Sequence, residues 1–215
     1  MPTYDATATV INNGDPTSVS LTVANQLNRL LIVAVGSLAG AGSAVTYAGV
    51  SMTETTGVGS PGIQIRNYYL VAPATGANDV SVTTAANKVY VVASSFYGVD
   101  QATPLGAFVT RAATVNNGDV SSLTPVSTVD DLVWDALGLD NHGGGVGDAA
   151  VGAGQTERAS LADADQRYKQ STEPGAAGTT TMSWTVSGLG VGVTNELVHI
   201  AVAINPPQAT QVMFY

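Results

Sequence analysis

Short runs of β-branched and aromatic residues, separated by Gly, Pro, Asn and Asp, continue through the whole chain. Several runs alternate apolar and polar positions, as 80–83 and 182–187 do, which is typical of strands with one buried face. Helical spacing is rare, and only 159–169 fits a short helix. The pattern predicts strands near 6–11, 18–23, 29–36, 44–52, 63–71, 78–84, 88–97, 107–115, 119–127, 131–138, 149–157, 165–172, 179–187 and 196–204.

Two of these runs, 30–35 and 199–204, are almost continuously apolar. Such runs indicate central strands that are covered on both faces. The turn sequences at 12–16 and 116–119 combine Asn, Gly and Asp, and each predicts a hairpin between its flanking strands. No internal repeat is evident, and no linker divides the chain. We therefore expect an all-β, antiparallel β-sandwich.

The length of 215 residues is within the range that all-β sandwiches reach as one domain. We expect a single domain over 1–215, with terminal arms at 1–5 and 206–215. Charged residues make up 11% of the chain, against about 25% in an average soluble domain. A sparsely charged surface suits a protein that packs against neighbours.

The net charge of −9 and the scattered basic residues change the list of partners. Proteins that bind nucleic acid or anionic membranes carry clustered cations, so neither nucleic acid nor a membrane is an expected partner. With no cysteine, disulfides and Cys-ligated zinc are excluded. The longest aliphatic run, 30–35, is far shorter than the roughly 20 residues of a membrane span. The first residues lack a secretory signal pattern, so we expect synthesis in the cytoplasm.

Few residues are candidates for chemistry. His199 is inside the final apolar run, so we expect it to have a hydrogen-bond partner in or beside the core rather than to act as a base. His142, with Asp140 and Asp148, is a candidate metal-binding set, but a Gly-rich loop tolerates His without a ligand role. No metal site is therefore expected here.

Two pairs of acidic residues are candidates for calcium, namely Asp130 with Asp131 and Asp163 with Asp165. Neither has the length or the Gly placement of a calcium loop, so solvated faces or turns are expected. No nucleophile elbow and no phosphate-binding loop is present. We therefore expect no catalytic residues, no cofactor and no enzyme activity.

Aromatic side chains are candidates for stacking on sugars. Trp134 and Trp184 lie in alternating strands and are expected in the core. Tyr68 and Tyr69 point to opposite faces of their strand, so one of them is a candidate for exposure. The other candidates are Tyr47, Tyr90, Phe96 and Tyr97.

Segments from about residue 28 to 206 carry a resemblance to a known kind of module. They include Asn28-Arg29-Leu30-Leu31-Ile32-Val33, Val45-Thr46-Tyr47-Ala48-Gly49-Val50, Ser95-Phe96-Tyr97-Gly98-Val99-Asp100-Gln101-Ala102-Thr103-Pro104, Asp131-Leu132-Val133-Trp134, Met182-Ser183-Trp184 and His199-Ile200-Ala201-Val202. Their order resembles the jelly-roll-type β-sandwich modules of bacteriophage structural proteins, either decoration (cement) or fibre proteins, and of bacterial surface proteins. The resemblance implies a jelly-roll-like sandwich and a role in a virion or at a cell surface. It brings no catalytic residues.

Together these observations predict a non-enzymatic structural virion protein, most specifically a capsid decoration or cement protein that stabilises the shell by bridging subunits. Its expected partners are the major capsid protein or other virion proteins and copies of itself, as a dimer or trimer, at the virion surface. The alternative is a carbohydrate-binding adhesion module of a phage tail or an extracellular bacterial surface protein. A glycoside hydrolase would need two carboxylates about 5 to 10 Å apart, and the sequence nominates no such pair.

The terminal arms are the expected contact points with partners. Residues 212–215 are apolar or aromatic, and the first arm combines a proline with an aromatic residue. The candidate partner-binding residues are Pro2, Tyr4, Val212, Met213, Phe214 and Tyr215.

Overall fold

The computed structural model describes residues 1–13, 15–37, 43–86, 88–141, 147–190 and 194–208, and these contain strands and turns but no helix. The strands of the first half are β1 (Thr3–Asn12), β2 (Thr17–Val23), β3 (Leu30–Ser37), β4 (Ser43–Tyr47), β5 (Val50–Ser51), β6 (Thr53–Ser60), β7 (Ile63–Val71), β8 (Gly76–Thr84) and β9 (Val89–Tyr97). Those of the second half are β10 (Val109–Val115), β11 (Val120–Leu123), β12 (Val126–Ser127), β13 (Leu132–Asp140), β14 (Asp148–Val151), β15 (Thr156–Ala162), β16 (Gln166–Pro174), β17 (Gly178–Thr179), β18 (Met182–Ser187) and β19 (Asn195–Ile204).

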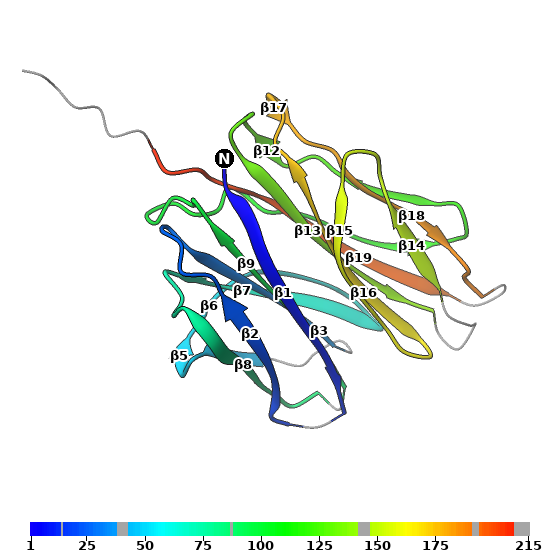
Figure 1. The fold of residues 1–215 in the computed structure, drawn as a ribbon. Coiled ribbons are helices and arrows are strands. Elements are labelled where there is room, and N and C mark those ends of the chain that lie inside the picture. Colours follow the sequence, from blue (N-terminus) through cyan, green and yellow to red (C-terminus); the bar gives the residue numbers. More distant parts are fainter. Residues whose placement is uncertain (14, 38–42, 87, 142–146, 191–193, 209–215) are drawn as a thin grey trace, which may run out of the picture.

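Antiparallel pairing organises these strands into two sandwiches (Figure 1). The first has an inner sheet of order β1-β9-β3-β7-β6 and an outer sheet of order β2-β8-β4-β5. The second has an inner sheet of order β10-β19-β13-β16-β15, and its outer layer consists of β11-β18-β14 and the short pair β12-β17. Within each sandwich, the chain passes back and forth between the two layers, in places after one strand and in places after two, as in a jelly roll. The predicted jelly-roll-like fold is confirmed.

The four layers are held together by four apolar clusters, one in the first sandwich, two in the second and one between the inner sheets. Leu21, Val33, Tyr47 and Val80 belong to the core of the first sandwich. Leu137, Trp184 and Val186 belong to that of the second. The two inner sheets also face each other, and Ile32, Phe96, Trp134 and Ile200 fill the space between them. Each fully buried large apolar side chain of this kind contributes about 1.5 to 3 kcal/mol. Whether the chain unfolds as the single domain predicted from its length stays a prediction.

The two halves share more than strand order. A β-bulge follows Glu54 in β6, where it pairs with β7, and another follows Glu157 in β15, where it pairs with β16. When the inner sheets are aligned on this bulge, Leu30, Ala34 and Gly36 of β3 take the positions of Leu132, Ala136 and Gly138 of β13.

The same equivalence recurs in bonds outside the strands. Glu54 pairs with Arg66, and Glu157 pairs with Lys169 at the equivalent position. The amide of Ala72 donates to the carbonyl of Arg29, and the amide of Gly175 donates to that of Asp131. The chain therefore contains a topological repeat, and the expectation that it has none is wrong at the level of structure.

The equivalent glycines bring the inner sheets together. A Cβ atom on Gly36 would lie 2.1 Å from Cε1 of Tyr168, and one on Gly138 would lie 3.0 Å from the same atom. The Tyr168 ring lies against both strands, and its centroid is 4.4 Å from that of Tyr90. Small residues at these two positions are therefore a condition of the packing between the sandwiches.

Several local expectations need correction. The residues proposed for a short helix form the end of β15, a turn and the start of β16, because the alternation of β15 at an edge lacks a strong apolar signal. Strand β6 was not expected at all, since its Gly- and Thr-rich sequence is half-exposed. The turns at 12–16 and 116–119 do not close hairpins, because β1 and β2, like β10 and β11, belong to different sheets.

The continuously apolar runs were predicted correctly. Strand β3 lies between β9 and β7 and is buried along its length, and the same holds for β19 between β10 and β13. Both strands are covered on both faces, β3 by the first outer sheet and β19 by the second, with the shared core on their other sides.

Candidate functional site

Both ends of the described chain lie at one end of the molecule (Figure 1). Here β1, β3 and β13 begin and β19 ends, since Thr3 pairs with Tyr97 and Leu132 pairs with Ile204. We call this the terminal end. It consists of residues 1–4, of the loops 24–29, 72–75, 98–104, 128–131, 175–177 and 205–208, and of β12 with the two residues before it.

Four exposed apolar side chains belong to the terminal end. Leu27 is 82% exposed, Val126 74%, Val129 64% and Met1 61%. Leu27 and Val129 occupy equivalent places, because each lies three residues before the first residue of a central strand, Leu30 or Leu132. Apolar groups exposed together on one side of a protein often mark a contact with a partner.

Two open grooves flank Met1. One, of about 730 Å³, is lined by Met1, Thr128, Asp130, Asp131 and residues 205–208. The other, of about 370 Å³, is lined by residues 1–4, Leu132, Thr156, Arg158, Thr172 and Pro174. Their sizes are comparable with those of ligand-binding clefts.

The structure places two of the predicted partner-binding residues beside these grooves. Pro2 is buried and Tyr4 is half-buried. The Tyr4 ring meets Phe96 edge-on at 6.1 Å between centroids, and the Arg158 guanidinium carbon lies 4.1 Å from the Tyr4 centroid. Tyr4 is part of β1 and pairs with Phe96, so these contacts add to the pairing of an edge strand. Val212, Met213, Phe214 and Tyr215 lie outside the described residues, so the predicted set stays a prediction.

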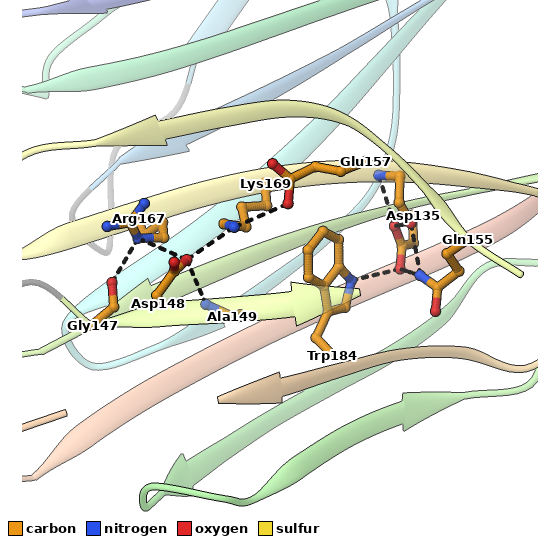
Figure 2. A network of polar contacts seen from close by, with 10 residues as sticks. Asp135, Gly147, Asp148, Ala149, Gln155, Glu157, Arg167, Lys169 and Trp184 are labelled. Atoms are coloured by element: carbon orange, nitrogen blue, oxygen red, sulfur yellow. Dashed lines mark hydrogen bonds and ion pairs between the residues drawn. The ribbon is translucent and has the colours of Figure 1, made fainter. Parts of the chain in front are cut away.

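A polar cluster is buried inside the second sandwich. Asp135 on β13 is fully buried and accepts hydrogen bonds from Nε1 of Trp184 at 2.7 Å and from the amide and hydroxyl of Ser171 at 3.0 and 2.6 Å. Nε2 of Gln155 lies at 3.4 Å, at the outer limit of hydrogen bonding (Figure 2). Donors from several strands thus converge on one carboxylate.

His199 on β19 links this carboxylate to Ser121 on β11. Nε2 of His199 lies 3.0 Å from Oδ2 of Asp135, and Nδ1 lies 3.0 Å from the Ser121 hydroxyl. Because Asp135 accepts its other hydrogen bonds, we assign the imidazole proton to Nε2, which leaves Nδ1 to accept the hydroxyl proton. The order of Ser, His and Asp is that of a nucleophilic triad.

This triad has no access to a substrate. Ser121, His199 and Asp135 are each 0% exposed. In the first sandwich, the positions of Asp135 and His199 are occupied by Val33 and Val91, which belong to its apolar core. The cluster is therefore a polar replacement for part of a core. The expectation of a partner for His199 in the core is confirmed, whereas nothing in the sequence identified Asp135 as that partner.

A second cluster closes the side edge of this sandwich. Nζ of Lys169 lies 2.9 Å from Oδ1 of Asp148 and 3.0 Å from Oε2 of Glu157, and Arg167 reaches Asp148 and the carbonyl of Gly147 (Figure 2). Burial alone would raise the pKa of the Asp148 carboxyl, but the bonds from Lys169 and the amide of Ala149 lower it on balance. The cluster keeps Lys169 paired while its aliphatic chain covers the core.

A third cluster joins the two sandwiches. Asp163 accepts bonds from Lys88 and from the Tyr90 hydroxyl, both on the other sandwich. Burial opposes ionisation of Asp163, but these bonds and the amides of Asp165 and Gln166 outweigh it and hold the pKa well below its usual range. Burial and the nearby carboxylate together raise the pKa of Tyr90. The cluster connects the two sandwiches through side chains beside their shared core.

Two other acidic candidates, Asp131 and Asp148, have structural partners. Asp131 accepts from the amide of Thr128 at 2.6 Å in a turn, and Asp148 is bound by Lys169. His142 lies outside the described residues. Within the described part of the chain, no group of three or more His, Asp or Glu residues is arranged to hold a metal ion.

The aromatic candidates for sugar stacking are mostly internal. Trp134 and Trp184 are fully buried, as expected, and so are Tyr47, Tyr90 and Phe96. Tyr68 is buried in the first sandwich, while Tyr69, on the opposite face, is half-buried against the shared core. No exposed aromatic platform is present among the residues that the structure describes.

The fold defines an all-β protein built from packed antiparallel sandwiches. Comparisons with protein-family models, with curated proteins and with solved structures find no match to this chain. The described residues form no long apolar helix of the kind that crosses a bilayer.

Proposed function

We propose that this chain is a non-enzymatic structural protein of a large assembly, most specifically a capsid decoration protein that attaches to the shell through its terminal end. The observation that carries the proposal is the collection of Met1, Leu27, Val126 and Val129 at that end. Burial of these side chains against a partner would remove apolar surface from water at about 25 cal/mol per Å².

The chemistry of the interior supports a non-enzymatic role. The groups best arranged for catalysis, Ser121, His199 and Asp135, are sealed between two sheets. The second sandwich would have to open, with loss of its core packing, before a substrate could reach them. The resemblance to phage structural modules supports the specific assignment to a capsid surface.

The sparse charge supports the same assignment. A net charge of −9 on a shell exterior would be kept away from packaged DNA, and only 11% charged residues leave much of the surface free for neutral contacts. The carbohydrate-binding alternative has less support, because no aromatic side chain is among the exposed large apolar residues of the described part of the chain.

The test is co-sedimentation of the purified chain with empty shells assembled from the major capsid protein of the same virus. Leu27→Asp combined with Val129→Asp is expected to abolish binding, since it places two charges in the contact. Val120→Asp is the matched control, because Val120 is 49% exposed at the opposite end of the second sandwich.

Circular dichroism and thermal unfolding would establish that the variants are folded. The proposal fails if wild-type protein does not bind shells, or if the double substitution binds as well as the control. Selective binding to a glycan array without shell binding would favour the adhesion module instead.

A further inference from the structure

The groove of about 370 Å³ beside Met1 contains an arginine whose charge has no counterpart in the described part of the chain. The other six Lys and Arg residues bond to a carboxylate or to a backbone carbonyl. Arg66, Lys88, Arg167 and Lys169 pair with acidic side chains, and Arg29 and Arg111 donate to carbonyls. Among the described residues, Arg158 donates only to a hydroxyl, that of Thr172, at 2.8 Å. In a chain with a net charge of −9, this guanidinium is an exception.

A β-bulge places Arg158 in the groove. Where β15 pairs with β16, Arg158 is the extra residue between Glu157 and Ala159, and a bulge redirects the side chain that it carries. The guanidinium carbon lies 4.1 Å from the centroid of Tyr4 on β1, and Nε is held by the hydroxyl of Thr172. The guanidinium is therefore fixed by the protein before any ligand binds.

The acidic residues nearest to this guanidinium along β1 and β15 have other partners. Asp5, the extra residue of a bulge in β1, accepts from the hydroxyl of Ser95 at 2.8 Å. Glu157 accepts from Lys169 at 3.0 Å. Nη1 and Nη2 of Arg158 thus have no acceptor among the described residues. Two parallel N–H groups of a guanidinium bind a carboxylate with two hydrogen bonds.

The remaining lining of the groove fits a peptide. Apolar side chains form much of it, and the residues Thr3 and Thr156 stand beside them. The groove lies between the first residues of β1 and β15, which are the outermost strands of the two inner sheets. Such edge strands offer backbone N–H and C=O groups to an added extended segment. We propose that this groove binds an extended peptide of a partner protein through an Asp or Glu side chain, whose carboxylate accepts from Nη1 and Nη2 of Arg158.

A peptide fits this groove better than an acidic sugar, which would offer the same carboxylate. A sugar ring needs an open aromatic face on which to stack, and Arg158 already covers a face of the half-buried Tyr4 ring. The apolar lining by Pro2, Leu132 and Pro174 suits the side chains that flank an acidic residue in a peptide. The inference does not rest on the proposed function, because it concerns the chemistry of one groove and not the identity of the assembly.

An array of short random peptides, acetylated and amidated at their ends, tests the proposal. Each peptide with a central Glu is printed beside the same peptide with a central Gln. Because the chain has no cysteine, a dye can be attached to the full chain through Ser187→Cys, which is exposed beside the loop 116–119 at the other end of the second sandwich. Arg158→Gln is the test variant. Arg111→Gln is the matched control, since Arg111 is also an edge-strand arginine without an acidic partner in the described residues.

The expected result is that the dye-labelled chain binds a subset of Glu peptides several times more strongly than their Gln counterparts. Arg158→Gln should abolish this preference, Arg158→Lys should retain only part of it, and Arg111→Gln should leave it unchanged. Thermal unfolding would establish that each variant is folded. The proposal is overturned if no peptide binds, if Glu and Gln peptides bind equally, or if the preference survives Arg158→Gln. Binding to uronic or sialic acids on a glycan array, without binding to peptides, would assign the groove to an acidic sugar instead. Because no shell is used, this result is separate from that of the co-sedimentation test.

Discussion

Substitution of Asp135 gives the sharpest energetic prediction, because the equivalent position of the first sandwich is apolar. Asp135→Val installs the residue that the first sandwich has at the equivalent position, Val33. The substitution removes the acceptor of Trp184 Nε1, of His199 Nε2 and of the Ser171 amide and hydroxyl. All of these donors stay buried, so they cannot turn to water.

Each buried donor left without an acceptor costs about 1 to 3 kcal/mol, so losing the shared acceptor of these donors should cost several kcal/mol in total. This is a large share of the roughly 5 to 15 kcal/mol by which a typical protein is stable. His199→Val alone leaves Asp135 with three hydrogen bonds and should cost less, about 1 to 3 kcal/mol. The double substitution recreates the Val33 and Val91 pair, so it should cost less than the sum of the single changes by about 1 to 3 kcal/mol.

Urea unfolding followed by fluorescence of Trp134 and Trp184 measures these values. Trp184 itself bonds to Asp135, so its emission should also shift in the native variant. Val33→Asp is the reciprocal control and should be strongly destabilising, since it buries a carboxylate among apolar neighbours. The reasoning is refuted if Asp135→Val costs less than about 1 kcal/mol, or if the two single changes are strictly additive.

Three further predictions test the interfaces. Gly36→Ala should lower the free energy of unfolding by about 1 to 3 kcal/mol, because the added Cβ would overlap the Tyr168 ring. Gly106→Ala should change it little, because the nearest atom to its added Cβ is 3.7 Å away. Equal effects of the two substitutions in thermal unfolding would contradict this. Because its pKa is lowered in the fold, ionised Asp163 contributes fully to stability above the unfolded pKa of about 3.9, and this contribution is lost as pH falls. The urea midpoint of the wild type should therefore drop more steeply between pH 5 and 2 than that of Asp163→Asn. Parallel curves would disprove this. Lys169→Met should cost less than about 1 kcal/mol in urea unfolding at neutral pH, because the side chains of Asp148 and Glu157 are 54% and 37% exposed and the Met side chain keeps the packing. A cost comparable to that of Asp135→Val would show that the edge cluster matters more.

Much of the sheet structure could be predicted from the sequence, because alternation and continuous apolar runs report burial directly. Strands β3 and β19 are examples, since both faces of each are covered. Strands β6 and β15 could not be found in this way. They are the equivalent edge strands of the two halves, each carries a bulge, and half-exposed edges need little apolar character.

The repeat itself was hidden because the halves conserve geometry more than residues. The two central strands share Leu, Ala and Gly at three positions, but Val33 has become Asp135 and Ile65 has become Tyr168. The partner of His199 was equally hidden, since 64 residues separate it from Asp135 and only the sheet register brings them together. The terminal end could not be recognised from the sequence, because its loops are far apart along the chain and only the fold brings them to one end of the molecule.

Hydrogen–deuterium exchange of the chain, free and bound to empty capsid shells, tests the proposed attachment most directly. The account predicts slower exchange on binding in the loops 24–29 and 126–131, with no change at 116–120 at the opposite end. Protection confined to 116–120, or to the outer faces of the sheets, would contradict it.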